Sequence, residues 1–338
     1  MYRPEGINVA FMTPFTNEGR IDEQVVREMA EWLVVKGVHG IFPVSTCGEF
    51  MHMSIEERKW LMDVTIDQVR GRCAVTPGIG ATCPRQSIAL ARHAKESGAD
   101  AVVILAPYFF TNTQDIVEKY VEVVADAVDM PIVLYNIPFF TNPILPQTVE
   151  RLAQRSNIVA IKDSSGNLVN LMNNIDLATS VRPDFHVLIG YEEGLFPALM
   201  AGAKGCMTAT SGILPEIMLD IYNSYKRGDY QNAYERQRSI IKLIRLMKIP
   251  NFPQGFKWGM EARGFRMGPP QQPISEAHAP AAYRAKEEIE AEIHRLLGTI
   301  GAAAAPAHAA LAGAAPAQPA SEQIETLVRQ VIAQLRLS

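Results

Sequence analysis

Residues 158–166 read IVAIKDSSG, an apolar run that ends in a lysine and a polar turn. Its apolar residues are consecutive rather than alternating, which is typical of a parallel strand covered on both faces. Seven other runs share this character, and the eight lie about 28 residues apart on average, the length of one βα unit. The predicted strands are Ile7–Thr13, Gly40–Val44, Ala74–Gly78, Ala101–Leu105, Ile132–Tyr135, Val159–Lys162, Val187–Gly190 and Gly205–Thr208.

Helical patterns separate these runs. Residues 21–36 place apolar side chains at a 3.6-residue period and stop before Gly37, a residue suited to a helix C-terminus. Eight alternating strand and helix units predict an α/β fold, a (β/α)8 TIM barrel over residues 1–213. A doubly wound sheet is the alternative, but that fold usually contains fewer strands.

The rest of the chain divides into three predicted parts. Residues 214–298 show no strand pattern and are expected to form a helical region packed on the barrel. Residues 299–320 are rich in Ala and Pro, contain no Asp, Glu, Lys or Arg, and are expected to be a linker. Residues 321–338 place apolar side chains on one helical face, which predicts a terminal amphipathic helix. Three longer helices are expected in the region after the barrel: Glu216–Lys226, Tyr230–Met247 and Ala281–Leu297.

Composition excludes several classes of function. The 32 basic and 36 acidic residues give a net charge of −4, so no basic excess is available to bind nucleic acid. No charge-free apolar run has the character of a membrane span, and the N-terminus has no signal-peptide pattern, so a cytoplasmic protein is expected. The four cysteines form no CxxC pair and the seven histidines show no metal-ligand spacing, which predicts free thiols and no metal.

The residues that could take part in a reaction are sought at the ends of the predicted strands, because reactive groups in a TIM barrel lie at the carboxyl ends of its strands. Lys162 closes the sixth run, where partial burial favours an amine nucleophile. Tyr135 closes the adjacent fifth run, and its phenol could relay protons. The alternatives are a lysine that extends to solvent and a tyrosine that only packs.

The second run leads into Ser45-Thr46-Cys47-Gly48-Glu49. Small hydroxyl residues followed by glycine permit a tight turn whose backbone N–H groups bind a carboxylate. A simple strand-to-helix turn with a capping hydroxyl is the alternative. Cys47 is a poor candidate nucleophile, because the sequence places no histidine to activate it. The run after the third strand has Cys83 where the last glycine of GxGxxG would stand, which argues against a dinucleotide site.

Taken together and in order, these segments resemble the dihydrodipicolinate synthase / N-acetylneuraminate lyase family of Schiff-base (class I) aldolases and lyases. The resemblance covers roughly residues 5–297 and rests on Ser45-Thr-Cys-Gly-Glu49, Glu56-Glu-Arg58, Pro77-Gly-Ile-Gly80, Pro107-Tyr108, Tyr135-Asn-Ile-Pro138, Ile161-Lys-Asp-Ser-Ser-Gly166 and Gly202-Ala-Lys-Gly205.

The resemblance implies a role for each matched position. Lys162 would form an imine with pyruvate or another 2-oxo acid, and no other cofactor or metal would be needed. Tyr135 and Thr46 would relay protons. Cys47 and Gly48, with Thr46, would bind the 2-oxo acid carboxylate, and the backbone carbonyl of Met207 would lie beside the imine. The second substrate would be an aldehyde, and the protein would form tetramers or dimers.

Two departures bear on the substrate. Phe140 stands where dihydrodipicolinate synthases have an arginine that binds the carboxylate of aspartate semialdehyde, and Phe109 replaces the second relay tyrosine. Both argue against lysine biosynthesis. A sugar-acid dehydratase using the same lysine imine and a non-catalytic 2-oxo acid-binding or scaffold paralogue remain alternatives, although the presence of Lys162 and Tyr135 argues against the latter.

The linker and terminal helix lie beyond the part covered by the family resemblance. An Ala/Pro linker before an amphipathic helix resembles the encapsulation peptides of bacterial microcompartment cargo, so residues 321–338 are expected to bind a shell or another cargo protein. A helix that docks on its own barrel, or forms a coiled coil, is the alternative. The apolar face consists of Ile324, Leu327, Val328, Val331, Ile332 and Leu335.

Overall fold

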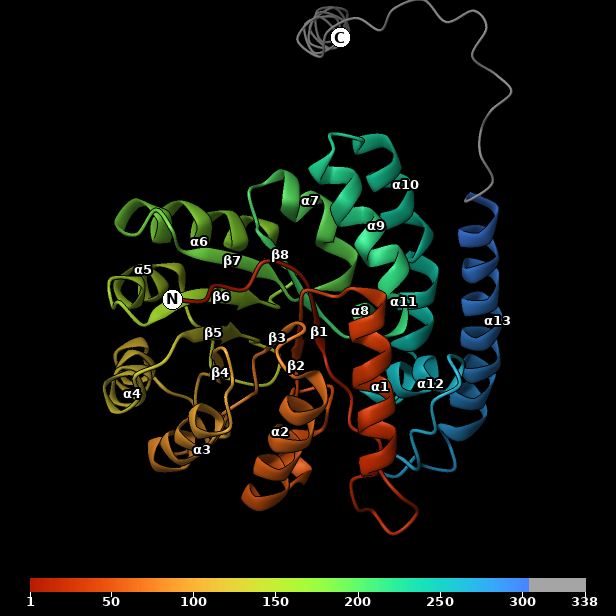
Figure 1. Ribbon diagram of the computed structural model, residues 1–338, viewed down its shortest axis with the longest axis horizontal. Helices are drawn as coiled ribbons and strands as arrows, with labels where there is room; N and C mark the ends of the chain where they lie inside the picture. Colours follow the sequence, from red (N-terminus) through yellow and green to blue (C-terminus); the bar gives the residue numbers. More distant parts are fainter. Residues whose placement is uncertain (304–338) are drawn as a thin grey trace, which may run out of the picture. The chain divides into compact units, whose positions relative to one another are not determined.

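The computed structural model describes residues 1–303, which contain the eight predicted strands in one parallel sheet. Their order, β3-β2-β1-β8-β7-β6-β5-β4, is that of a TIM barrel, and Figure 1 shows the strands at the centre with helices around them. The fold prediction is therefore confirmed. The strands are β1 (Gly6–Ala10), β2 (Gly40–Phe42), β3 (Ala74–Val75), β4 (Val102–Leu105), β5 (Ile132–Asn136), β6 (Ile158–Asp163), β7 (His186–Ile189) and β8 (Gly205–Thr208).

The ring closes between β3 and β4 through a short contact. Gly78 and Val103 form an isolated parallel bridge. The N–H of Val103 donates to Pro77 O and the N–H of Ile79 donates to Val103 O, both at 2.9 Å. Pro77 has no N–H to offer, so a regular ladder cannot continue through it and β3 is shorter than predicted.

Eight helices accompany the strands. Asp22 begins α1 by accepting a hydrogen bond from Val25 N–H at 3.3 Å, and Gly37 ends it in a left-handed conformation (φ 82°), as predicted. Ser54 and Glu57 form a capping box at the start of α2. The helices are α1 (Glu23–Lys36), α2 (Ile55–Val69), α3 (Pro84–Glu96), α4 (Gln114–Ala127), α5 (Pro146–Ala153), α6 (Leu168–Val181), α7 (Leu195–Met200) and α8 (Thr210–Ile213). Two 3₁₀ turns, η1 (Phe50–His52) and η2 (Glu192–Gly194), follow β2 and β7.

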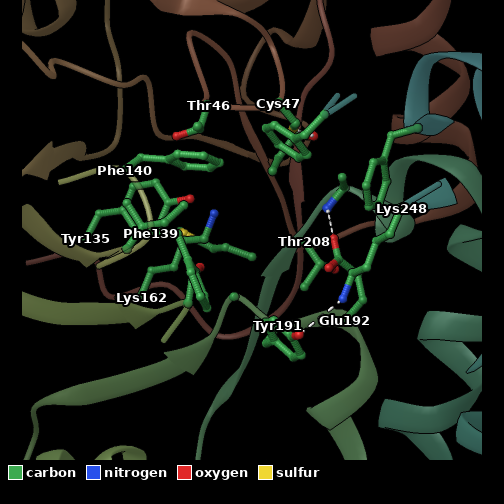
Figure 2. A pocket seen from close by; sticks show the side chains of 18 residues that line it. Thr46, Cys47, Tyr135, Phe139, Phe140, Lys162, Tyr191, Glu192, Thr208 and Lys248 are labelled. Carbon is green, nitrogen blue, oxygen red and sulfur yellow. Dashed lines mark hydrogen bonds between the residues drawn. The ribbon is translucent and has the colours of Figure 1, made fainter. Parts of the chain in front are cut away.

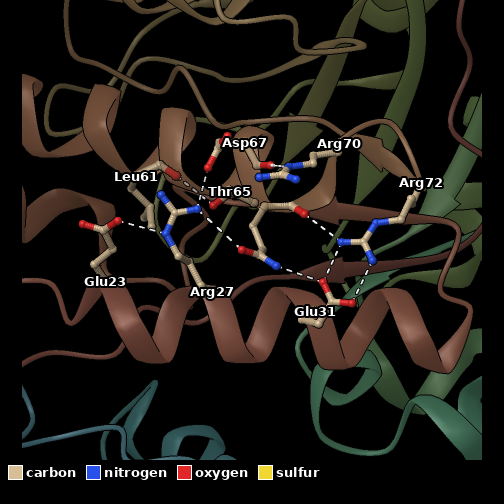
Figure 3. Close-up of polar contacts among 9 residues, drawn as sticks. Glu23, Arg27, Glu31, Leu61, Thr65, Asp67, Arg70 and Arg72 are labelled. Atoms are coloured by element: carbon tan, nitrogen blue, oxygen red, sulfur yellow. Dashed lines mark hydrogen bonds and ion pairs between the residues drawn. The ribbon is translucent and has the colours of Figure 1, made fainter.

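An exposed polar network joins α1 to α2 and to the turn after it (Figure 3). Arg27 donates to Glu23 at 2.9 Å and to Asp67 at 2.6 Å, and Arg72 holds both carboxylate oxygens of Glu31 at 2.8 and 2.6 Å. The hydrogen bond from Arg72 is the main reason that the pKa of Glu31 falls to about 2. Because these groups are exposed, salt screens the network, and the apolar residues beneath it carry the packing.

The region after the barrel is helical, with α9 (Pro215–Lys226), α10 (Tyr230–Ser239), α11 (Ile241–Met247), α12 (Gln254–Glu261) and α13 (Ala279–Ala303). The predicted single helix Tyr230–Met247 is wrong, because it breaks at Ile240, where Ser239 Oγ donates to Arg236 O at 2.7 Å. Helix α12 was not predicted, because its two glycines, Gly255 and Gly259, lower helix propensity.

Helix α13 runs to Ala303, into the stretch predicted as linker, and most of that stretch and the predicted terminal helix lie outside the described residues. No helix within residues 1–303 is long and apolar enough to cross a membrane.

Gly78→Ala is expected to lower the thermal unfolding midpoint. A Cβ at Gly78 would overlap Val44 O and lie 3.2 Å from Phe42 Cε2, at the place where the ring closes. Crowding of this kind costs about 1–3 kcal/mol. Gly298→Ala in α13 is the matched control, because nothing lies within 4 Å of its Cβ position. The control is expected to unfold at or above the wild-type midpoint. Equal midpoints for the two variants would contradict the claim that a side chain at Gly78 crowds the point of ring closure.

Candidate functional site

A cavity of about 280 Å³ opens at the carboxyl ends of the strands. Its wall comes from β1, β5, β6 and β8, from the turns after β2, β5, β6 and β7, and from α12 with the segment before it (Figure 2). Gly48 is the predicted site residue that does not line it. The predicted site residues that do are Lys162, Tyr135, Thr46, Cys47 and Met207.

Lys162 and Tyr135 are brought together by strand register. They are Cα partners in the ladder between β5 and β6, and both side chains are 3% exposed. Lys162 Nζ lies 4.0 Å from the centroid of the Tyr135 ring and 5.1 Å from that of Phe42. The amine therefore lies close to two aromatic rings in the cavity wall, and Figure 2 shows the Tyr135 side chain beside Lys162.

Gly190, at the end of β7, gives this amine its space. A Cβ at Gly190 would overlap Ser164 Oγ and come within 2.6 Å of Lys162 Cε. Without a side chain at that position, the lysine stem and the serine hydroxyl share one wall of the cavity. Any larger residue would displace one of them.

The turn after β2 is held against β1 by its own side chains. Ser45 Oγ donates to Phe11 O at 2.8 Å and accepts from Gly48 N–H at 3.0 Å. A Cβ at Gly48 would lie 2.6 Å from Phe11 O, so only glycine fits there. The N–H of Gly48 is thus committed within the turn, and this residue shapes the turn rather than facing the cavity.

The middle of the turn presents groups without protein partners. Thr46 Oγ1 is buried and has no hydrogen-bond partner in the described part of the chain. The N–H groups of Thr46 and Cys47 likewise donate to no acceptor among residues 1–303. Two successive N–H groups beside a hydroxyl make a concave donor set of the kind that binds carboxylates.

The thiol of Cys47 is already hydrogen-bonded within the protein. It donates to Ala10 O at 3.2 Å and lies 3.2 Å from Ser45 Oγ. Burial raises its pKa to about 11. At neutral pH it is a protonated thiol and not a nucleophile, which agrees with the lack of an activating histidine in the sequence.

Strand β8, which β7 separates from the strand of Lys162, also contributes to the cavity wall. Met207 is completely buried on β8, and the neighbouring Thr208 shares a 2.6 Å hydrogen bond with Ser211. Both Met207 and Thr208 line the cavity.

Two polar residues of the wall were missed by the sequence analysis. Ser164 Oγ is buried without a hydrogen-bond partner in the described residues. Glu192 is 8% exposed, accepts from Ala209 N–H at 3.0 Å and has its pKa raised by burial. Ser164 follows Lys162 by two positions and Glu192 follows the end of β7, so inspecting every strand end would have found both.

A second lysine of the wall is already paired. Lys248 donates to Glu193 at 2.5 Å and to Tyr191 Oη at 3.2 Å, and its pKa is raised by these partners. Its charge is therefore compensated before any substrate enters.

An aromatic wall, defined as Phe139, Phe140, Phe252 and Phe256, forms the other side of the cavity mouth. Phe252 lies 5.8 Å from Phe140 and 5.8 Å from Phe256 between ring centroids. Rings thus stand where the family resemblance would place a cation. Phe109 is 88% exposed and does not line the cavity of its own chain, so the structure places it apart from Lys162 and Tyr135.

The arrangement suits covalent chemistry on an amine. Lys162 supplies the nucleophile, Tyr135 and Thr46 supply hydroxyls, and the turn supplies anion-binding donors. Within residues 1–303, no group of three or more His, Cys, Asp or Glu side chains has the geometry to hold a metal ion.

Comparison with known proteins agrees on one family. The model of the Dihydrodipicolinate synthetase family matches residues 3–294. An uncharacterized DapA-like lyase of Pyrococcus horikoshii is 37% identical over 271 residues, covering 80% of this chain and 93% of that protein. A protein of Escherichia coli K12 named probable 2-dehydro-3-deoxy-D-pentonate aldolase is 32% identical over 305 residues, covering 89% of this chain and 99% of that protein.

Solved structures have the same fold. The crystal structure of YagE, a prophage protein of the dihydrodipicolinic acid synthase family from Escherichia coli K12 in complex with pyruvate, superposes with a TM-score of 0.78. The two sequences are 29% identical, and the match covers 88% of this chain and 98% of YagE.

Cys47 is expected to resist alkylation in the native protein. With a pKa of about 11 its thiolate fraction near pH 8 is about one in a thousand, and burial adds a steric barrier. Iodoacetamide treatment followed by peptide mapping should leave Cys47 unmodified until the protein is unfolded in urea. Labelling of native Cys47 as fast as in the unfolded chain would show that the turn is open and the thiol ionised.

Proposed function

The chain belongs to the dihydrodipicolinate synthetase family, and we propose that it makes or breaks a C–C bond between pyruvate, or a similar 2-oxo acid, and an aldehyde. It is an enzyme of the class I aldolase and lyase type. The observation that carries the proposal is the buried Lys162 amine beside Tyr135 at the inner end of a cavity whose wall includes unpartnered donors. The crystal structure of YagE in complex with pyruvate supports the choice of 2-oxo acid.

In the proposed reaction the turn first orients the acid. The carboxylate of pyruvate accepts hydrogen bonds from the N–H groups of Thr46 and Cys47, which directs C2 toward Lys162 Nζ. Attack by the amine gives a carbinolamine, and loss of water gives a protonated imine. Tyr135, with Thr46, carries the protons that leave the amine and reach the departing hydroxyl.

The positive charge of this imine would meet the ring faces already around the amine. Centroid distances of 4.0 Å to Tyr135 and 5.1 Å to Phe42 lie within the range of cation–π attraction. This attraction offsets part of the desolvation of a cation in a buried position.

The C–C step follows from the imine. In cleavage, Tyr135 accepts the proton of the C4 hydroxyl, the C3–C4 electron pair moves toward the iminium nitrogen, and an aldehyde leaves an enamine behind. Protonation of the enamine at C3 and addition of water to the imine then release pyruvate and restore Lys162. Aldol addition is the same sequence in reverse.

The second substrate is proposed to be a small aldehyde without a carboxylate or phosphate. The aromatic wall offers no cation, and the charge of Lys248 is already met by Glu193. The Ser164 hydroxyl can hydrogen-bond an aldehyde oxygen, and the Glu192 carboxyl group can accept a hydrogen bond from an aldehyde's hydroxyl. The aldolase name of the Escherichia coli relative supports cleavage over dehydration.

Two further proposals concern assembly. The exposed pair Phe109 and Phe110, 88% and 74% exposed, supports a homo-oligomer, a dimer or tetramer, because such rings favour burial against another copy. The sequence of residues 321–338 supports packaging of this cytoplasmic enzyme in a bacterial microcompartment, where aldehydes would be confined.

Borohydride reduction in the presence of pyruvate is expected to add a pyruvate-derived mass to the peptide that contains Lys162. Lys162→Ala should abolish both the label and turnover while circular dichroism stays unchanged. Lys119→Ala, at an exposed lysine, is the control and should label normally. A label on another lysine, or none, would refute the imine. A labelled protein that dehydrates a sugar acid without C–C cleavage would support the dehydratase instead.

Activity with pyruvate and aspartate semialdehyde is expected to be low, with kcat/KM well below about 10⁴ M⁻¹ s⁻¹. Phe140 cannot hold the semialdehyde carboxylate as an arginine does with two parallel hydrogen bonds. Phe140→Arg should raise kcat/KM for this substrate and lower it for uncharged aldehydes. Efficient wild-type turnover of aspartate semialdehyde would disprove the proposed acceptor class.

Residues 301–338 fused to a fluorescent protein are expected to concentrate in microcompartments when co-expressed with shell proteins of the same organism. An isolated helix of this length is marginal in water, so its apolar face needs a partner. Changing Leu327 and Val331 to Glu places charge on that face and should abolish the localisation. A diffuse fusion, or equal localisation of the double variant, would refute targeting. Loss of barrel stability on truncation at residue 300 would favour docking on the barrel.

A further inference from the structure

A buried ion pair joins the turn after β2 to α12. Lys257 Nζ lies 2.9 Å from Glu49 Oε2, and the two side chains are 0% and 3% exposed. The ammonium also lies 4.7 Å from the centroid of the Phe15 ring. Removing two charges from water is costly, so a buried pair is weak evidence for stability and needs another explanation.

Glu49 occupies a backbone conformation that needs restraint. Its φ of 60° lies in the left-handed region, and so does that of Val44 at 57°, a β-branched residue for which this is a clear outlier. These two residues bracket the turn. Non-glycine residues persist in such conformations where surrounding contacts impose them, and such strain is concentrated at functional sites.

The ion pair provides a restraint at the second of these positions. The N–H of Glu49 donates to Thr46 O at 3.1 Å, so the backbone of Glu49 is bonded to the residue that faces the cavity. Its carboxylate is bound to Lys257. The residue before Lys257 is Phe256, part of the aromatic wall, so one contact links the two sides of the site.

We propose that Lys257 is a positioning residue for the 2-oxo acid. By holding the Glu49 carboxylate in a water-free place, it keeps Glu49 left-handed and keeps the N–H groups of Thr46 and Cys47 turned toward the cavity. This inference rests on the proposed function, because it assumes that those N–H groups bind the carboxylate of pyruvate. Lys257 touches no substrate and acts through Glu49.

The test separates positioning from stability by removing charge in two ways. Lys257→Met leaves Glu49 buried without a partner, whereas Glu49→Gln with Lys257→Met leaves neither charge. Arg263→Met is the matched control. It removes the ion pair between Arg263 Nη2 and Glu216 Oε1, which lie 2.7 Å apart, and neither of these largely buried residues lines the cavity. Three quantities are measured in the full chain: the thermal midpoint, the pyruvate concentration for half-maximal borohydride trapping, and the rate at which iodoacetamide labels Cys47.

Lys257→Met is expected to raise the half-maximal pyruvate concentration about tenfold or more, with faster labelling of Cys47. The double variant should recover thermal stability, since no charge is left unpaired. Its half-maximal pyruvate concentration should stay raised, and Cys47 should still be labelled faster than in the wild type. The double variant also carries the test if Lys257→Met does not fold. Arg263→Met should lower the midpoint and leave the other two quantities unchanged.

Recovery of all three quantities in the double variant would overturn the proposal, because the pair would then serve stability alone. Equal effects of Arg263→Met on trapping would overturn it as well. If pyruvate does not trap on the wild-type protein, the proposed function fails by itself. The rate at which Cys47 is labelled in the double variant then still tests whether Lys257 holds the turn. Labelling at the wild-type rate would show that it does not.

Discussion

The burial of one amine is the constraint on which the rest of this structure depends. Lys162 lines the cavity and is only 3% exposed, so few water molecules can reach its side chain. Several neighbouring groups accommodate the buried amine. Ring faces from β2 and β5 attract its cation, a glycine at the end of β7 leaves room for its stem, and parallel register places Tyr135 directly beside it.

The sequence predicted what depends on local pattern and strand order. Eight apolar runs at regular spacing gave the barrel, and the rule that chemistry lies at strand ends placed Lys162 beside Tyr135, as the β5–β6 register confirms. The sequence did not predict the features that depend on contacts between residues far apart in the chain. Helix α12 was missed because Gly255 and Gly259, which pack against Met247 and Ile213, obscure the helical pattern. The Glu49–Lys257 pair spans 208 positions and leaves no periodic signal.

The cavity wall is lined by two chemically different kinds of side chain, and this bears on selectivity. Its wall combines aromatic rings with a buried carboxyl group, a hydroxyl and a lysine already bound to Glu193. A charged aldehyde would lose its hydration without gaining a counter-charge. Under the proposed function, selection among aldehydes would therefore depend largely on rejecting charge, and several uncharged aldehydes could share the site.

The seam between β3 and β4 has a consequence for motion. Elsewhere in the described residues neighbouring strands pair through ladders, that of β5 and β6 with a register shift at Ile132/Val133, but here the ring closes through the Gly78–Val103 bridge and the few hydrogen bonds around it. Local opening requires fewer bonds to break at this point than between β5 and β6. Amide protons of Ile79 and Val103 would thus exchange with solvent ahead of those beside Lys162, and the barrel can open locally at this seam while its reactive amine stays enclosed.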